Sequence, residues 1–165
     1  MQSSNSRLFF DSFLKPNYDE WLNDHCDLRR AMNATLSANH MADWYFKDLK
    51  CLKKLPLSIS NVREFRDDLV TNICADFKII RDVADAHEHF ELSRPSRNVT
   101  TAKQTTAGSL GWGEGGWGEG GWGEGVWGGG PQLIIKLDNG QKRAFSAPMM
   151  NVFKMWEDLL PRHGL

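Results

Sequence analysis

The sequence contains no long apolar run, and its cysteines are few and scattered. No stretch approaches the roughly 18 consecutive apolar residues that a transmembrane helix needs, and residues 1–7 lack the charged-then-apolar layout of a secretory signal. Cys26, Cys51 and Cys74 form no Cys-x-x-Cys pair or Cys/His cluster, which argues against a disulfide framework and a zinc knuckle. We therefore expect a cytoplasmic protein without a membrane segment.

An excess of charge of one sign is also missing, because 20 Lys+Arg face 21 Asp+Glu. A balanced chain has no general attraction for nucleic acid, so any contact with RNA has to be local. The chain does contain apolar material: 41% of its 165 residues are hydrophobic, with seven Trp and nine Phe. That is enough for one core, and we expect a single domain over residues 1–165.

The first half of the chain has the apolar spacing of two long helices. Asn17 with Glu20 three residues on makes a capping-box pattern, which predicts a helix from Asn17 to about Leu52. Residues at helical spacing form its expected core stripe, namely Trp21, Leu28, Met32, Leu36 and Phe46.

A second helix is predicted after Ser58 or Ser60, either of which can cap, and it ends near Leu92, before Arg94-Pro95. The short connection makes residues 17–95 an antiparallel helical hairpin.

The second half is divided by a repeat. Residues 96–110 are polar and aperiodic and are predicted to form a loop, and residues 111–130 are copies of a five-residue Gly-Trp-Glu unit. The repeat carries three Glu and no Lys or Arg, so it would repel phosphate. We interpret residues 96–130 as a flexible loop with a tolerated insertion, whose Trp side chains could anchor a protein partner.

Residues 131–165 regain regular patterning. Two apolar runs flank an Asn-Gly turn at residues 138–141, which predicts a β-hairpin with a type I′ turn. Ser146 then caps a final helix with a continuous apolar face, the natural third layer for the helical hairpin. The predicted fold is therefore mainly α, with a long antiparallel helical hairpin, a C-terminal β-hairpin and a terminal helix.

The densest group of polar residues lies near the end of the second predicted helix. At about 100° per residue, Asp82, Asp85 and His89 share one stripe with Arg81 at its edge, whereas His87 lies on the apolar face. A second group, His40, Asp43 and Trp44, lies in the first predicted helix. In an antiparallel hairpin that group is expected closer to residues 63–72 than to His89.

These two groups carry a resemblance. Arg81 followed by His87 fits the Arg-x(4–6)-His motif of HEPN domains, helical modules that often act as metal-independent ribonucleases in toxin-antitoxin and phage-defence systems. Segments 40–44 and 81–89 together are similar to a group of uncharacterised bacterial proteins with H-x-x-D-W and R-D-x-A-x-x-x-K-H patterns, with Glu88 at the lysine position. The resemblance covers about residues 28–97 and implies a HEPN-like bundle, a homodimer and an RNA substrate.

The implied chemistry is attack of the ribose 2′-hydroxyl on the adjacent phosphate, without a cofactor. His87 would be the general acid or base and Arg81 would stabilise phosphoryl charge, with Asp82 beside them in the catalytic set. The candidate binding residues are His40, Asp43, Trp44, Asp85 and His89. On a straight helix, however, Arg81 and His87 diverge by roughly 120°.

Other interpretations of the same residues stay open. Asp82, Asp85 and His89, with His40 or Asp43, could hold a metal ion. The purely structural alternative is that His87 is a core histidine and that the other residues form a solvated helix face with an Arg81–Asp85 pair. The corresponding functions are a HEPN-like ribonuclease, a non-catalytic protein-binding or regulatory module using the Trp-rich loop, and a metal-binding helical protein.

Overall fold

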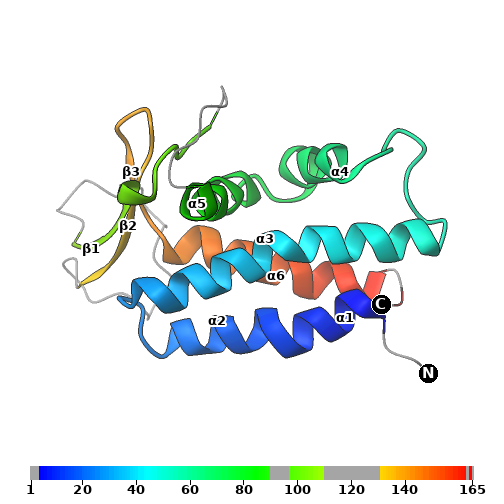
Figure 1. Cartoon of the computed structure of the whole chain (residues 1–165), viewed down its shortest axis with the longest axis horizontal. Coiled ribbons are helices and arrows are strands. Elements are labelled where there is room, and N and C mark those ends of the chain that lie inside the picture. The colour runs from blue at the N-terminus through cyan, green and yellow to red at the C-terminus, as the bar shows by residue number, and fades with distance from the viewer. Residues whose placement is uncertain (1–3, 90–96, 110–130, 163, 165) are drawn as a thin grey trace.

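The computed structural model describes residues 4–89, 97–109, 131–162 and 164. They form a mainly helical body with a small antiparallel sheet at one end (Figure 1). The mainly α class, the C-terminal β-hairpin and the terminal helix are confirmed. No helix in these ranges combines the length and apolarity needed to cross a membrane.

The chain begins with a helical run whose first part, before Asn17, the sequence did not predict. α1 (Asn5–Phe9), the π-helical turn η1 (Phe10–Leu14) and α2 (Lys15–Leu22) follow one another directly, with Ser4 as N-cap. The expected helix start at Asn17 is wrong: Asn17 lies inside α2 and its amide donates to Ser37 Oγ at 2.7 Å.

α3 (Leu28–Cys51) is a separate helix that packs against α1, α2, α5 and α6. Asp27 caps it by accepting from the Arg30 amide at 3.0 Å, and Asp24 accepts from the Cys26 amide in the turn between the two helices. The expected end near Leu52 is confirmed. Trp21, Met32 and Phe46 are buried as expected, but Leu28 is 39% exposed.

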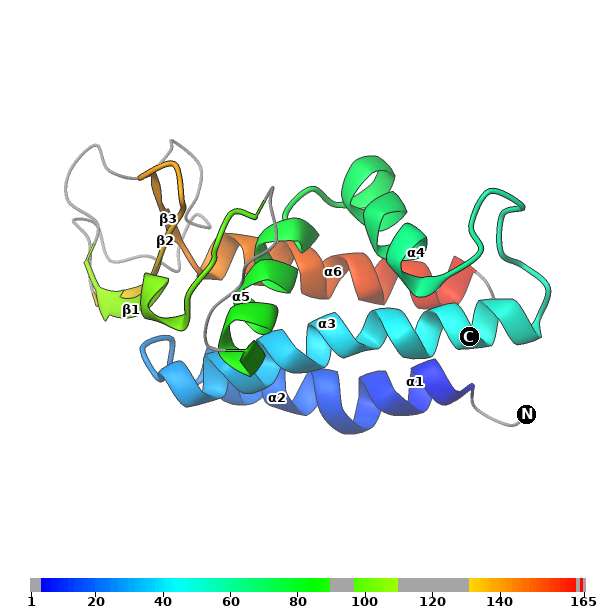
Figure 2. The same cartoon turned by 45° about the horizontal axis from the view of Figure 1, so that its top comes forward.

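The second predicted helix is also broken. α4 (Val62–Asp68) is capped by Asn61 rather than Ser58 or Ser60, runs into the π-helical turn η2 (Leu69–Ile73), and is followed after residues 74–76 by α5 (Phe77–His89). Asp76 fixes the break, because its carboxylate accepts from Arg143 Nη1 at 2.9 Å and from Asn151 Nδ2 at 2.8 Å. The break lets α5 turn across α3 (Figure 2). The expected end near Leu92 lies outside the described residues.

The sheet has three short antiparallel strands in the order β1 (Thr105–Gly108), β2 (Gln132–Lys136), β3 (Lys142–Ala144). The expected loop at 96–110 therefore contains a strand, which is a correction. The turn is not type I′, because that turn needs a positive φ at both central residues and only Gly140, at φ 85°, has one. The hairpin instead has a three-residue loop that ends in this left-handed glycine.

The Gly-Trp-Glu repeat at 111–130 lies outside the described residues. Its two flanks are described: Gly108 and Gln132 are register partners of β1 and β2. The repeat is therefore an insertion between two adjacent paired strands.

α6 (Ser146–Arg162) supplies the third layer, as expected. It packs on α3 and α5, and Trp156, which is fully buried, donates to the Ala38 carbonyl at 3.1 Å. In return, Tyr45 donates its hydroxyl hydrogen bond to the Leu159 carbonyl at 2.7 Å. These two bonds fix the register of α6 on α3.

Candidate functional site

The two aspartates of the predicted stripe bind one arginine. Asp82 has no exposed surface, and its carboxylate accepts from Arg97 Nη1 at 2.8 Å and from the Asn98 amide at 2.7 Å. Asp85 accepts from the same Nη1 at 2.6 Å. Burial lowers the pKa of Arg97, but the hydrogen bonds to both carboxylates outweigh burial and raise it above its ordinary value. This cluster fastens Arg97 and Asn98 to α5.

The two residues of the HEPN-like motif point to different neighbours. Arg81 Nη1 donates to Asp67 on α4 at 3.0 Å, so the expected Arg81–Asp85 pair is wrong. His87 Nδ1 donates to the Val83 carbonyl at 2.9 Å, one helical turn back. α5 is an unbroken α-helix over both positions, so the divergence of about 120° stands.

The break before α5 brings His40 of α3 next to Glu88 at the end of α5. His40 Nε2 lies 3.1 Å from Glu88 Oε1, with side chains 48% and 32% exposed, and His89 is exposed beside Glu88. The expectation that this part of α3 lies nearer α4 holds for Asp43, which accepts from Arg66 Nη2 at 3.0 Å. It is wrong for His40, because α5 crosses α3 instead of running antiparallel to it.

No metal centre forms among the described ranges, since no three His, Cys, Asp or Glu side chains gather there. The expected ligands Asp82 and Asp85 already bind Arg97, whose fixed positive charge opposes a cation at the same oxygens. The solvated-face interpretation also fails for Asp82, which is fully buried.

Trp44 belongs to a surface that the sequence did not predict. Its ring stacks on Phe9 with centroids 5.3 Å apart, and Phe9 stacks on Phe13 at 5.1 Å. Trp44 is 39% exposed, Phe13 54% and Leu8 59%. We call Phe9, Phe13 and Trp44 the aromatic face. The i, i+4 spacing of Phe9 and Phe13 indicates such a pair once the segment is known to be helical.

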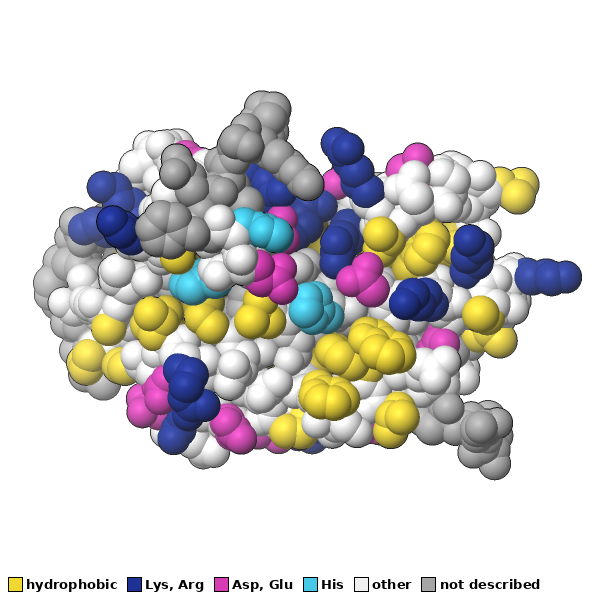
Figure 3. All heavy atoms as spheres, in the orientation of Figure 1, with side chains coloured by type: hydrophobic (Ala, Val, Ile, Leu, Met, Phe, Trp, Pro, Cys, Tyr) yellow, Lys and Arg dark blue, Asp and Glu magenta, His cyan; other side chains and the backbone are white. Residues whose placement is uncertain are grey.

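Lys47 of α3 borders the aromatic face. Lys47 Nζ lies 5.8 Å from the centre of the Trp44 ring, in cation–π range. Residues 47–54 contain four lysines and a single acid, Asp48. Asp48 is buried and accepts from the Ser6 amide and hydroxyl, both at 2.7 Å, so it holds α1 and faces inward. Figure 3 shows hydrophobic side chains gathered over α1 and α3 with basic and acidic side chains beside them.

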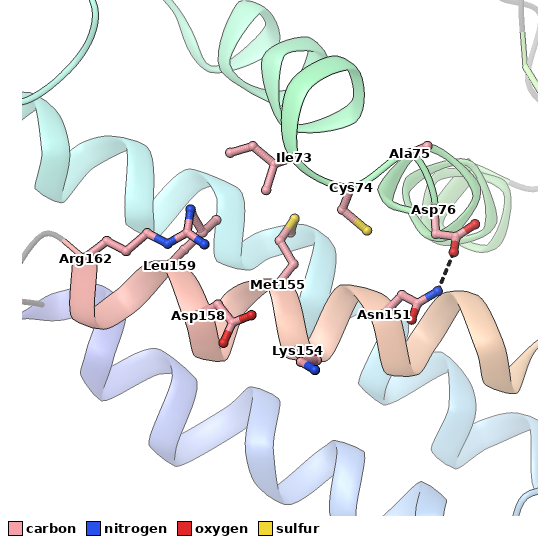
Figure 4. Close-up of a pocket in the computed structure, with 10 residues that line it drawn as sticks. All are labelled: Ile73, Cys74, Ala75, Asp76, Asn151, Lys154, Met155, Asp158, Leu159 and Arg162. Carbon is pink, nitrogen blue, oxygen red and sulfur yellow. Dashed lines mark hydrogen bonds between the residues drawn. The ribbon is translucent and has the colours of Figure 1, made fainter. Parts of the chain in front are cut away.

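A pocket of about 420 Å³ lies on other elements, between α6 and the break at residues 73–76 (Figure 4). None of the residues predicted from the sequence to form a site lines it. Its walls combine apolar side chains with basic and acidic ones, and the Asp76–Asn151 hydrogen bond closes one end.

Comparisons with known protein families, with curated proteins and with solved structures find no match.

Proposed function

We propose that this chain is a non-catalytic protein-binding module whose aromatic face holds an acidic segment of a partner protein with large apolar side chains. The observation that carries the proposal is the Phe9–Phe13–Trp44 stack, in which the Phe13 and Trp44 rings are exposed. The module remains one of the functions that the sequence suggested, but its binding element is the helical body and not the Trp-rich repeat.

The apolar half of the proposal rests on burial. About half of Phe13 and more than a third of Trp44 are exposed to solvent. Covering each ring should contribute roughly 1 kcal/mol to the free energy of binding. Their stacking on Phe9 fixes both rings before binding, so little side-chain entropy is lost when a partner docks. Contiguous exposed aromatic side chains of this kind mark interaction sites.

The acidic half rests on charge. Lys47 lies over the rim of Trp44, and the single acid among residues 47–54 is turned inward to Ser6. A partner with Asp or Glu beside its apolar residues gains opposite-charge contacts at this rim, whereas a basic partner is repelled.

Catalysis has less support from the contacts of α5. Arg81, Asp82 and His87 each have a partner inside the chain, and Arg81 and His87 diverge. The HEPN-like ribonuclease with a homodimer cleft stays a prediction. A cytoplasmic location suits the proposed module, because Cys26, Cys51 and Cys74 are free thiols.

Selection of peptides from a random display library on the intact chain tests the proposal. We expect the enriched peptides to combine Trp, Phe or Leu with Asp and Glu, and Trp44→Ala to weaken their binding by more than roughly tenfold. Lys47→Glu should weaken the same peptides through repulsion.

Two matched variants serve as controls. Leu28 is also on α3 and has the same exposed fraction, 39%, so Leu28→Ala removes a partly exposed apolar side chain away from the aromatic face. Lys103→Glu reverses a charge on the distant η3 (Ala102–Gln104). Enrichment of basic peptides, or equal losses for Leu28→Ala and Trp44→Ala, would overturn the proposal. So would RNA cleavage in EDTA that His87→Ala abolishes.

A further inference from the structure

The pocket between α6 and residues 73–76 has an apolar interior. Met155 and Leu159 are 5% and 4% exposed, and Ile73 is 44% exposed although it lines the pocket. In Figure 4, Ile73 and the Cys74 thiol point from the break toward the space into which Met155 projects from α6. An exposed isoleucine facing buried apolar side chains leaves a surface that an apolar ligand group can cover.

The charged side chains that line this pocket are mainly basic when Asp76, which is paired within the chain, is set aside. Asp76 is already bound to Arg143 and Asn151. Lys154 and Arg162 take part in no ion pair with the described residues, and Asp158 offsets one of these two charges. The Arg162 guanidinium lies beside Leu159, at the end of the pocket opposite the Asp76–Asn151 bond (Figure 4).

The volume limits the ligand to a small molecule. At about 420 Å³, the pocket lies in the range of small-molecule sites, which is roughly 300–1,000 Å³. With Asp76 neutralised by Arg143, the other charged lining side chains sum to +1, which suits one negative charge on the ligand. A guanidinium next to an apolar wall suits a carboxylate joined to a hydrocarbon body.

We propose that this pocket binds a small monoanionic amphipathic molecule of the carboxylate class, with its hydrocarbon body between Ile73, Cys74 and Met155 and its carboxylate at Arg162. The pocket shares no residue with the aromatic face, so this second binding function stands independently of protein docking.

Cys74 provides a reporter inside the pocket. Octanoate serves as the probe, and we expect it to slow the alkylation of Cys74 by iodoacetamide severalfold while Cys51, which is exposed, reacts at an unchanged rate. Acetate has the charge without the hydrocarbon body, and octanol has the body without the charge. Both should protect Cys74 much less than octanoate does.

Isothermal titration calorimetry of octanoate gives a second measurement that does not depend on thiol reactivity. Arg162→Gln should weaken octanoate binding by roughly tenfold, because it removes a charge-assisted hydrogen bond. Lys103→Gln, which removes a distant charge, should leave binding unchanged. Equal binding of octanol and octanoate, no effect of Arg162→Gln, or equal protection of Cys51 and Cys74 would overturn the proposal.

Discussion

The polar residues of α5 make their interactions inside the chain, whereas the aromatic face leaves apolar surface exposed to solvent. Arg81, Asp82 and His87 have the chemistry of a catalytic site, yet each already has a hydrogen-bond partner within the chain. Phe13 and Trp44 are of a residue type that usually fills a core, yet they face solvent.

The difference shows that residue type alone is a weak guide to function in this protein. A buried carboxylate with its hydrogen bonds made contributes to stability and has little left to offer a ligand. Exposed rings held in a stack retain unburied surface that only a partner can cover. Variants should therefore separate two groups, with loss of the buried Asp82 acting on stability and aromatic-face changes acting on binding.

The largest expected effect is on Asp82. Asp82→Ala leaves the Arg97 guanidinium with Asp85 alone and the Asn98 amide unpaired, so the free energy of unfolding should fall by about 3 kcal/mol or more. Urea denaturation followed by circular dichroism measures this loss. Glu88→Ala removes a partly exposed carboxylate on the same helix and should change the free energy of unfolding by less than about 0.5 kcal/mol. Equal losses would contradict the assigned role of Asp82.

The next effect concerns Tyr45, the inward-facing neighbour of Trp44. Tyr45→Phe removes the hydrogen bond to the Leu159 carbonyl and should cost about 1 kcal/mol at neutral pH. Burial raises the pKa of the Tyr45 phenol above its ordinary value near 10.

The sign of its pH dependence follows from that shift. Because the folded-state pKa is raised, the contribution of the neutral phenol is complete below about pH 10 and is lost as the pH rises further. The difference in unfolding free energy between the original chain and Tyr45→Phe should therefore shrink above pH 10. A constant difference from pH 7 to 11 would count against the buried, neutral phenol.

A smaller effect is expected from the repeat. Replacing residues 110–130 with a four-residue turn shortens the connection between β1 and β2, and the lower loop-closure entropy should stabilise the fold by about 1 kcal/mol. Binding of the selected acidic peptides should stay within twofold. Loss of peptide binding in the shortened chain would move the binding element from the aromatic face to the repeat.

Local patterns predicted the parts of the fold that depend on short-range interactions. The β-hairpin and α6 follow from a turn and a helix start written in adjacent residues. The helical segment before residue 15 was missed because apolar residues lie on both of its sides, Leu8 and Phe13 outside and Phe10 and Leu14 inside, which blurs the helical period.

The break before α5 and the candidate site depended on distant residues. Residues 74–76 contain no Gly or Pro, and the break is held by Arg143 and Asn151 from far along the chain. The pattern placed Asp82 and Asp85 on one side of the helix correctly, and Arg97 indeed contacts both. It could not show that Arg97 would neutralise them.

The smallest effect is expected for Arg81. Its pair with Asp67, which is 56% exposed, is screened by solvent, so Arg81→Gln should change the free energy of unfolding by less than about 0.5 kcal/mol. Urea denaturation beside Asp82→Ala gives the comparison within one helix. A loss as large as that of Asp82→Ala would show that the Arg81–Asp67 contact is structural.

The affinity of one selected acidic peptide for two variants tests the central claim most directly. Fluorescence anisotropy should show that Trp44→Ala weakens binding by more than roughly tenfold, while the double change Arg81→Gln with His87→Gln leaves it within twofold. The reverse order, with binding lost in the α5 variant and kept in Trp44→Ala, would contradict the assignment of binding to the aromatic face.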